Sequence, residues 1–320
     1  MNKTIKGMRM EKPARKESSN MLMMTDIIKG VNAVLNPGKP EINWFAPDPE
    51  AKAAIHIRDG RIDKSLSNSK ALYGGTIDDQ NLKNVKVVAY DGRDGGIYAE
   101  GPGSKVTVDG AYISTAGNGS GIGGPSSGAA VKRGASMTLK NAVINTSGRT
   151  RYSTAAEENA TLRVYNSVIW SHGMPFGDEI PEPTELMSTP PPALEIKGNT
   201  RTHCTMSNSQ SYFYNTKIIC DGWAALSTES SEGFVYLEAN DCDIICTKSG
   251  YGAYSDPGCH DVFNNCYIDT SCMMGIVAGN SDMTFNNCKA ECGTYFGLMH
   301  CVNGWQEEVA EMIINGGEIH

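Results

Sequence analysis

The tetrapeptide Asn166-Ser167-Val168-Ile169 has a close copy 25 residues earlier, Asn141-Ala142-Val143-Ile144. The same pattern, a polar or glycine residue, a small residue, any residue and then an aliphatic one, recurs along the chain. Its other copies are Gly110–Ile113, Asn215–Ile218, Asp241–Ile244, Asn265–Ile268, Asn287–Ala290 and Gly316–Ile319. Their last residues are separated by 31, 25, 49, 26, 24, 22 and 29 residues. A period in the twenties with β-type alternation is typical of a β-solenoid, in which each repeat forms one stacked coil.

Each position of the repeat predicts a column of like side chains. The aliphatic position is expected to stack in the core, and the Asn or Asp three residues before it is expected to sit at a bend and bond its neighbours. Two further columns hold small residues, and six of the ten cysteines fall in them: Cys220, Cys242, Cys246, Cys266, Cys288 and Cys292. Because Ala, Ser or Thr replaces them in other copies, we predict buried, reduced thiols. No paired C-x-x-C motif indicates a metal site, and no cofactor is predicted.

The Asn column, the stacked Ile and the coil length resemble the pectin-lyase-like superfamily of right-handed parallel β-helices. The resemblance covers residues 104–320. It implies an all-β fold, a single-stranded right-handed parallel β-helix, but not one activity, because the superfamily includes lyases, hydrolases, esterases, epimerases, tailspikes and adhesins. Ser171-His172-Gly173 matches the Gly-His-Gly element of its polygalacturonases only in part, and Asp78-Asp79 lies too early in the chain. No family mechanism is therefore carried over.

The remaining segments are expected to complete this solenoid. Residues 1–50 are predicted to form an N-terminal arm and a capping helix, and residues 51–103 irregular first coils. Residues 104–320 are predicted to form the regular coils. They are interrupted at about 173–209 by a long loop, because this stretch contains six prolines between Pro175 and Pro192. Whether the 49-residue step is one coil with this loop or two coils stays open.

Charge and hydropathy narrow the function classes. The formal net charge is -8 and the sequence pI is about 5.3, which disfavours nucleic acid as a partner. No apolar run of signal-peptide or transmembrane length is present, so the sequence predicts a cytoplasmic protein with no membrane contact. The repeat at Glu318-Ile319-His320 still has the pattern of a coil. We therefore expect a homo-oligomer or a companion chain at the C-terminal end.

The register of the repeat predicts one cluster that could carry chemistry. His172 and Asp221 both lie three residues after the repeat Ile, and Lys248 follows one coil later. Equivalent positions in adjacent coils are about 4.8 Å apart, so an acid/base pair with a neighbouring cation is expected. The alternative is a polar surface column without catalysis.

Further residues are predicted to complete the site. Flat side chains for binding a cyclic ligand are expected on the same face: Arg149, Trp223, Tyr251 and Tyr295. Arg201 and His203, in the Pro-rich insertion, are expected to fold over the cluster and assist catalysis. Glu229 and Glu232 lie in a turn and are expected to be solvated.

Two functions remain open at this point. The first is an enzyme of lyase, hydrolase or isomerase type that acts by acid/base chemistry on a carbohydrate or similar polar cyclic substrate. The second is a non-catalytic binding or structural solenoid similar to a tailspike or an adhesin. The varied loops and the single insertion favour the enzyme, because structural solenoids usually keep uniform turns.

Overall fold

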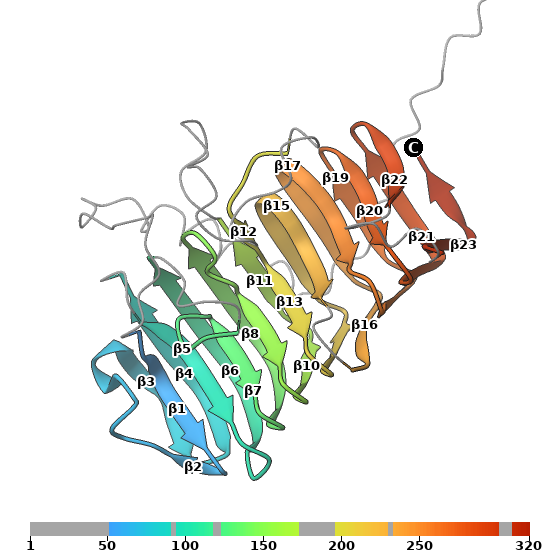
Figure 1. The fold of residues 1–320 in the computed structure, drawn as a ribbon. Coiled ribbons are helices and arrows are strands. Elements are labelled where there is room, and N and C mark those ends of the chain that lie inside the picture. Colours follow the sequence, from blue (N-terminus) through green and yellow to red (C-terminus); the bar gives the residue numbers. More distant parts are fainter. Residues whose placement is uncertain (1–50, 91–93, 118–122, 173–195, 230–232, 301–308) are drawn as a thin grey trace, which may run out of the picture. The chain divides into compact units, whose positions relative to one another are not determined.

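The computed structural model describes residues 51–90, 94–117, 123–172, 196–229, 233–300 and 309–320, all of which belong to one compact unit, Pro40–His320 (Figure 1). Within these ranges the chain forms one sheet of 23 strands and a 3-10 turn, η1 (Ser69–Ala71). The strands are β1 (Ala53–Arg58), β2 (Arg61–Ile62), β3 (Leu72–Asp78), β4 (Asn81–Ala89), β5 (Gly95–Glu100), β6 (Lys105–Ala116), β7 (Ala129–Lys132), β8 (Ser136–Ser147), β9 (Thr154–Glu157), β10 (Thr161–Tyr165), β11 (Val168–Ser171), β12 (Thr200–Arg201), β13 (His203–Met206), β14 (Gln210–Tyr214), β15 (Lys217–Glu229), β16 (Val235–Asn240), β17 (Asp243–Ser255), β18 (Cys259–Asn264), β19 (Tyr267–Thr270), β20 (Met273–Ala278), β21 (Asp282–Cys292), β22 (Tyr295–His300) and β23 (Glu311–Ile319).

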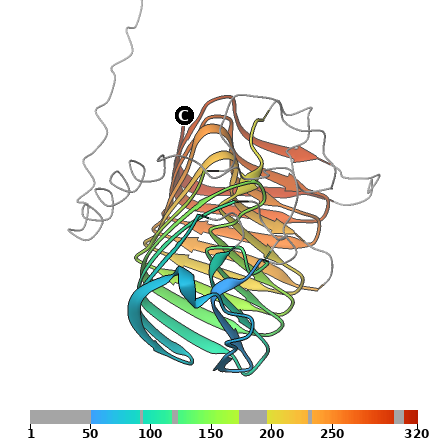
Figure 2. The ribbon, with the colours of Figure 1, turned by 90° about the vertical axis from the view of Figure 1, so that its left-hand side faces the viewer.

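Successive repeats pair in parallel and in the register that the sequence predicts. Ile144 pairs with Ile169 between β8 and β11, and Ile169 pairs with Ile218 between β11 and β15. The same column continues through Ile244 and Ile268. The predicted stacking of the repeat Ile residues is therefore confirmed, and Figure 2 shows the strands of successive repeats lying in rows.

The predicted fold class is nevertheless wrong in how the sheet closes. The sheet closes into a barrel of ten parallel strands around one axis, rather than winding as an open right-handed solenoid with a capping helix. The repeat sets which residues pair between strands, whereas closure depends on strand tilt and stagger, which a local repeat does not encode. The predicted arm and capping helix at residues 1–50 lie outside the described residues.

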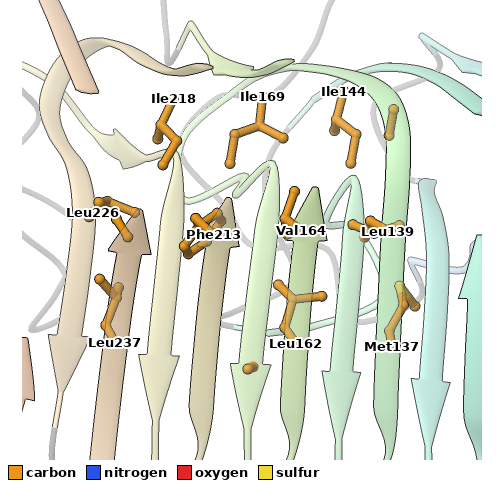
Figure 3. Packing of buried hydrophobic residues seen from close by; sticks show 14 of the residues in the cluster. Met137, Leu139, Ile144, Leu162, Val164, Ile169, Phe213, Ile218, Leu226 and Leu237 are labelled. Atoms are coloured by element: carbon orange, nitrogen blue, oxygen red, sulfur yellow. The ribbon is translucent and has the colours of Figure 1, made fainter. Parts of the chain in front are cut away.

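The core follows from the alternation of apolar residues along each strand. Met137 and Leu139 on β8, Leu162 and Val164 on β10 and Phe213 on β14 are at most 1% exposed (Figure 3). Since successive side chains of a strand point to opposite faces, the polar residues between them face outward. The sheet therefore buries one continuous apolar face.

A sharp bend precedes each repeat Ile, within β8 and after β10 and β14. Asn141, Asn166 and Asn215 occupy it with φ of 53°, 48° and 46°, a left-handed conformation that Asn tolerates better than most residues. The side-chain amide of Asn215 donates to Asn166 Oδ1 over 2.9 Å. The predicted Asn column is thus confirmed, both as a bend and as a hydrogen-bonded ladder.

The 49-residue spacing between Ile169 and Ile218 corresponds to one repeat that carries an insertion. Thr161 on β10 pairs directly with Gln210 on β14, so no complete repeat lies between them. Residues 173–195 of the predicted loop lie outside the described residues. From Thr200 onward the chain is again in strands, β12 and β13, so the insertion ends earlier than the prediction of about residue 209.

Candidate acid/base site

Asp221 is the centre of a hydrogen-bonded cluster on strands β11, β15 and β17. Its Oδ1 accepts from the indole N–H of Trp170 over 2.8 Å and from the hydroxyl of Thr247 over 3.0 Å. Its Oδ2 lies 3.1 Å from His172 Nδ1 and 3.2 Å from Lys248 Nζ. The prediction that His172 and Asp221 come within hydrogen-bonding distance is confirmed, and Lys248 lies beside them.

A local irregularity in the sheet brings Thr247 and Lys248 to this carboxylate. Cys220 pairs with Cys246, but Gly222 pairs with Ser249, so β17 has one more residue here than β15. A bulge of this kind redirects side chains and often lies beside a functional site. Thr247 and Lys248 lie within the bulge, and both contact Asp221.

The surroundings of Asp221 keep it ionised. Burial alone would raise the pKa of this carboxyl group, which is only 5% exposed. The hydrogen bond and charge of His172, the Trp170 donor and the charge of Lys248 outweigh burial and lower the pKa to about 2. Asp221 is therefore a fixed negative charge near neutral pH.

The imidazole of His172 is held on both sides. Nδ1 faces the Asp221 carboxylate, and Nε2 lies 2.6 Å from Oδ1 of the buried Asn145. The Trp170 ring packs against it with 4.4 Å between the ring centroids. An ionised carboxylate can only accept, so Nδ1 carries a proton and Nε2 is the nitrogen through which the ring could exchange one with a second molecule. The His172 side chain is 17% exposed, and that of Lys248 is 49% exposed.

The predicted aromatic platform does not form beside this cluster. Trp223 and Tyr251 are each only 3% exposed and belong to a separate apolar cluster that includes Ile196 and Met273. The bulge also shifts their register, because Trp223 pairs with Gly250 and Tyr251 pairs with Ala224. Neither ring is therefore presented to solvent as a ligand-binding surface.

Arg201 forms a second, buried polar group. Its guanidinium is ion-paired with Glu229 and lies 4.2 Å from the centroid of the Trp223 ring. Glu229 is 4% exposed, so the expectation that it is solvated is wrong; Glu232 lies outside the described residues. Arg201 is equally buried, and its guanidinium contacts Ser227 and Glu229 in the interior rather than the Asp221 carboxylate.

The remaining predicted residues are His203, Arg149 and Tyr295, and their surroundings differ. His203 is fully buried against Phe213, bonded to the hydroxyls of Thr154 and Thr205, and burial lowers its pKa to about 3. Arg149 is 6% exposed, whereas Tyr295 on β22 is 68% exposed.

The sequence-based analysis missed Trp170 and Asn145. Both lie on the same outward face as His172: Trp170 is two residues before it in β11, and Asn145 pairs with Trp170 across β8 and β11. The alternation of side chains along a strand would have placed Trp170 beside His172. The pairing of Asn145 with His172 depends on side-chain length and direction, which the spacing does not reveal.

The comparisons with known proteins identify no relative. No family model, no curated protein and no solved structure matches this chain, so nothing identifies the pectin-lyase-like superfamily. Within the described ranges, no helix is long and apolar enough to cross a membrane. In the same residues, no three His, Cys, Asp or Glu side chains gather closely enough to hold a metal ion.

Proposed function

We propose that this protein is an acid/base enzyme of lyase, hydrolase or isomerase type, with His172 as the proton carrier. The observation that carries the proposal is the bonding of His172 to an ionised, almost buried Asp221, while the imidazole keeps a partly exposed edge. A carboxylate in this position fixes the tautomer and orientation of the imidazole and stabilises its protonated form.

In this proposal each member of the cluster has a distinct role. His172 Nε2 gives a proton to, or takes one from, the substrate, and Asp221 holds the ring in place. The Asn145 amide has to release Nε2 for this step, because it occupies that nitrogen in the structure. Lys248, half-exposed and bonded to Asp221, supplies a positive charge for an oxygen that becomes negative during reaction.

A carbohydrate or similar polar cyclic molecule is the substrate class that suits this surface. The half-buried Trp170 ring lies next to His172 and offers an apolar face to a substrate ring. Polar groups of His172 and Lys248 border it, which suits a ligand that carries many hydroxyl groups. The cytoplasmic location, and the exclusion of nucleic acid, membrane and cofactor, stay predictions from the sequence.

One observation favours a non-catalytic binding or structural role instead. Both ring nitrogens of His172 have a partner within the protein, and the predicted aromatic platform is buried. A saturated network of this kind also stabilises a surface without performing chemistry. The two functions differ in whether Nε2 of His172 is used.

A substrate screen separates these functions. Purified protein is incubated with neutral, uronate-containing and sulfated oligosaccharides, and the products are analysed by chromatography and mass spectrometry, which distinguish added water, elimination and isomerisation. For any substrate found, His172→Gln and Asp221→Asn should each lower kcat by about a hundredfold or more, which is the usual effect of losing general acid or base catalysis. Glu291→Gln, an exposed change on β21, is the control and should leave kcat unchanged. Full turnover by His172→Gln, or no turnover of any sugar class, would favour the non-catalytic role.

A further inference from the structure

Aromatic side chains gather on the outer face of β14 and of the strands beside it. The outward residues of β10, β14 and β16 alternate with buried ones and are themselves half-buried. The ring centroids of Tyr165 and Tyr214 lie 4.7 Å apart, and those of Tyr212 and Tyr236 lie 5.8 Å apart. We call this group the aromatic surface; its members are Tyr165, Tyr212, Tyr214, Phe234, Tyr236 and the imidazole of His260.

The pairing of the strands does not require aromatic residues at these positions. Tyr165 pairs with Lys140 of the preceding repeat, and Tyr236 pairs with Gln210. Tyr212 pairs with Glu238 of the following repeat. The same columns therefore accept polar residues, so the concentration of rings over three repeats is a property of this surface and not of the sheet.

Phe234, the residue directly before β16, is the most open ring of the surface. It is 48% exposed and lies nearly parallel to the rings of Tyr236 and His260, with 5.9 and 5.2 Å between centroids. Its backbone N–H donates to Asn208 Oδ1 over 3.0 Å. Gly233 precedes it with φ of 75°, where an added Cβ would lie 2.6 Å from the Asn208 side chain. The backbone thus fixes a large apolar ring in a half-exposed position, where it can pack against a second molecule.

Hydrogen bonds hold polar groups in place beside the rings. The Tyr236 hydroxyl donates to Glu238 Oε2 over 2.8 Å, and the Asn240 amide donates to Glu238 Oε1 over 2.8 Å. The Tyr212 hydroxyl donates to Gln210 Oε1 over 2.9 Å. Each carboxylate oxygen has a second lone pair, so Glu238 can also accept from a ligand hydroxyl. Because these side chains are already ordered, less conformational entropy is lost when a ligand binds.

The charges on and beside the aromatic surface are balanced. The Arg163 guanidinium lies 5.1 Å from the centroid of the Tyr212 ring, and Lys140 follows on β8. Glu238 on β16 and Asp282 on β21 carry the opposite charge, and Asp282 contacts His260. This arrangement gives no net attraction for a sulfated or uronate-containing sugar, whereas a neutral sugar needs none.

We infer that the aromatic surface binds a neutral oligosaccharide, with Phe234 as the ring against which one sugar lies. Sugar rings present apolar C–H faces edged by hydroxyl groups, which match half-exposed aromatic rings bordered by fixed polar side chains. On each strand the surface precedes the bend, whereas His172 follows it. The surface is therefore a second site, and it does not depend on the proposed acid/base function.

A glycan array followed by calorimetry tests this binding. The labelled full chain is applied to neutral, uronate-containing and sulfated oligosaccharides, and the Kd of the best neutral one is measured by isothermal titration calorimetry. The wild type should bind a neutral oligosaccharide and should not prefer the acidic ones. Phe234→Ala should raise Kd by about tenfold, which corresponds to the loss of one aromatic contact. Phe234→Trp should retain binding, because indole offers a larger face.

Two matched variants serve as controls, and circular dichroism checks that every variant is folded. Phe296→Ala removes a ring of similar exposure, 50%, from β22 and should leave Kd unchanged. His172→Gln should also leave it unchanged; loss of binding in this variant would place the sugar at the acid/base site and overturn the inference. An array without neutral binding, a preference for sulfated sugars or an unchanged Kd in Phe234→Ala would each overturn it as well, and a protein partner would then be the occupant to seek.

Discussion

Asp221 Oδ2 lies 3.1 Å from His172 Nδ1, although 49 residues separate the two in the sequence. The contact joins β15 to the residue that follows β11, strands that pair in register from Val168 and Lys217 onward. The same carboxylate also accepts from Trp170, Thr247 and Lys248. The buried Asp221 carboxylate thus connects three strands by hydrogen bonds. We therefore expect its substitution to affect both stability and activity.

Asp221→Asn should lower the free energy of unfolding by about 1–3 kcal/mol, the range for a buried hydrogen-bonding group that loses its partner. The new amide keeps one acceptor oxygen, but its NH2 group cannot accept from His172 or Lys248. Urea unfolding at neutral pH measures the change. Asp241→Asn is the matched control: it lies in the bend column, where Asn is the usual residue, and should change stability by less than about 0.5 kcal/mol. Equal effects of the two substitutions would contradict the structural role of Asp221.

The stabilisation by Asp221 should disappear in acid. Its pKa is about 2 in the folded protein, against an ordinary value of 3.8. A carboxyl group with a lowered folded pKa contributes stability that is fully present above its unfolded pKa and is lost as the pH falls toward the folded pKa. The contribution is on the order of 2 kcal/mol, so the difference between wild type and Asp221→Asn should shrink by that amount between pH 5 and about pH 2. A difference that stays constant over this range would show that Asp221 has an ordinary pKa.

Cys242, Cys266 and Cys288 should be unreactive in the folded protein. All three are free and buried, as the repeat predicts. The pKa values of Cys266 and Cys288 are raised, first by contact with the neighbouring thiol of the column and then by burial, so neither forms a reactive thiolate. Mass spectrometry after labelling with a thiol reagent should find them modified only when denaturant is present. Tyr73→Cys, exposed on β3, serves as the positive control. Rapid native labelling of the three cysteines would show that the column is accessible.

Substitutions at two neighbouring isoleucines of β17 distinguish packing in the core from packing on the outer face. Ile244 is fully buried in the repeat column, whereas Ile245, the next residue of β17, faces outward and is half-buried. Ile244→Ala should lower the free energy of unfolding by about 2–5 kcal/mol, and Ile245→Ala by about 1 kcal/mol or less. Denaturant unfolding of the two variants under the same conditions gives the comparison. Similar losses would mean that the column is not the core.

The outcome for His172, Asp221, Trp223 and Tyr251 depended on whether the strand register around each residue was regular. His172 and Asp221 share an offset from Ile169 and Ile218, and the regular pairing of β11 and β15 brings them together. Trp223 and Tyr251 lie beyond the bulge between Cys220 and Gly222, so their predicted alignment fails by one residue. A one-residue shift changes which face a strand residue occupies, and the repeat spacing does not show where a bulge lies.

The sequence by itself determined the pairing of the strands, the Asn bends and the small, buried thiols, because these depend on residue types repeated at fixed intervals. The tertiary structure alone decided the closure of the sheet around one axis, the burial of Arg201 and Trp223 and the partners of Trp170 and Asn145. Closure depends on the tilt and stagger of all the strands together. Burial and side-chain partners depend on segments far apart in sequence, so no single repeat contains the information that fixes them.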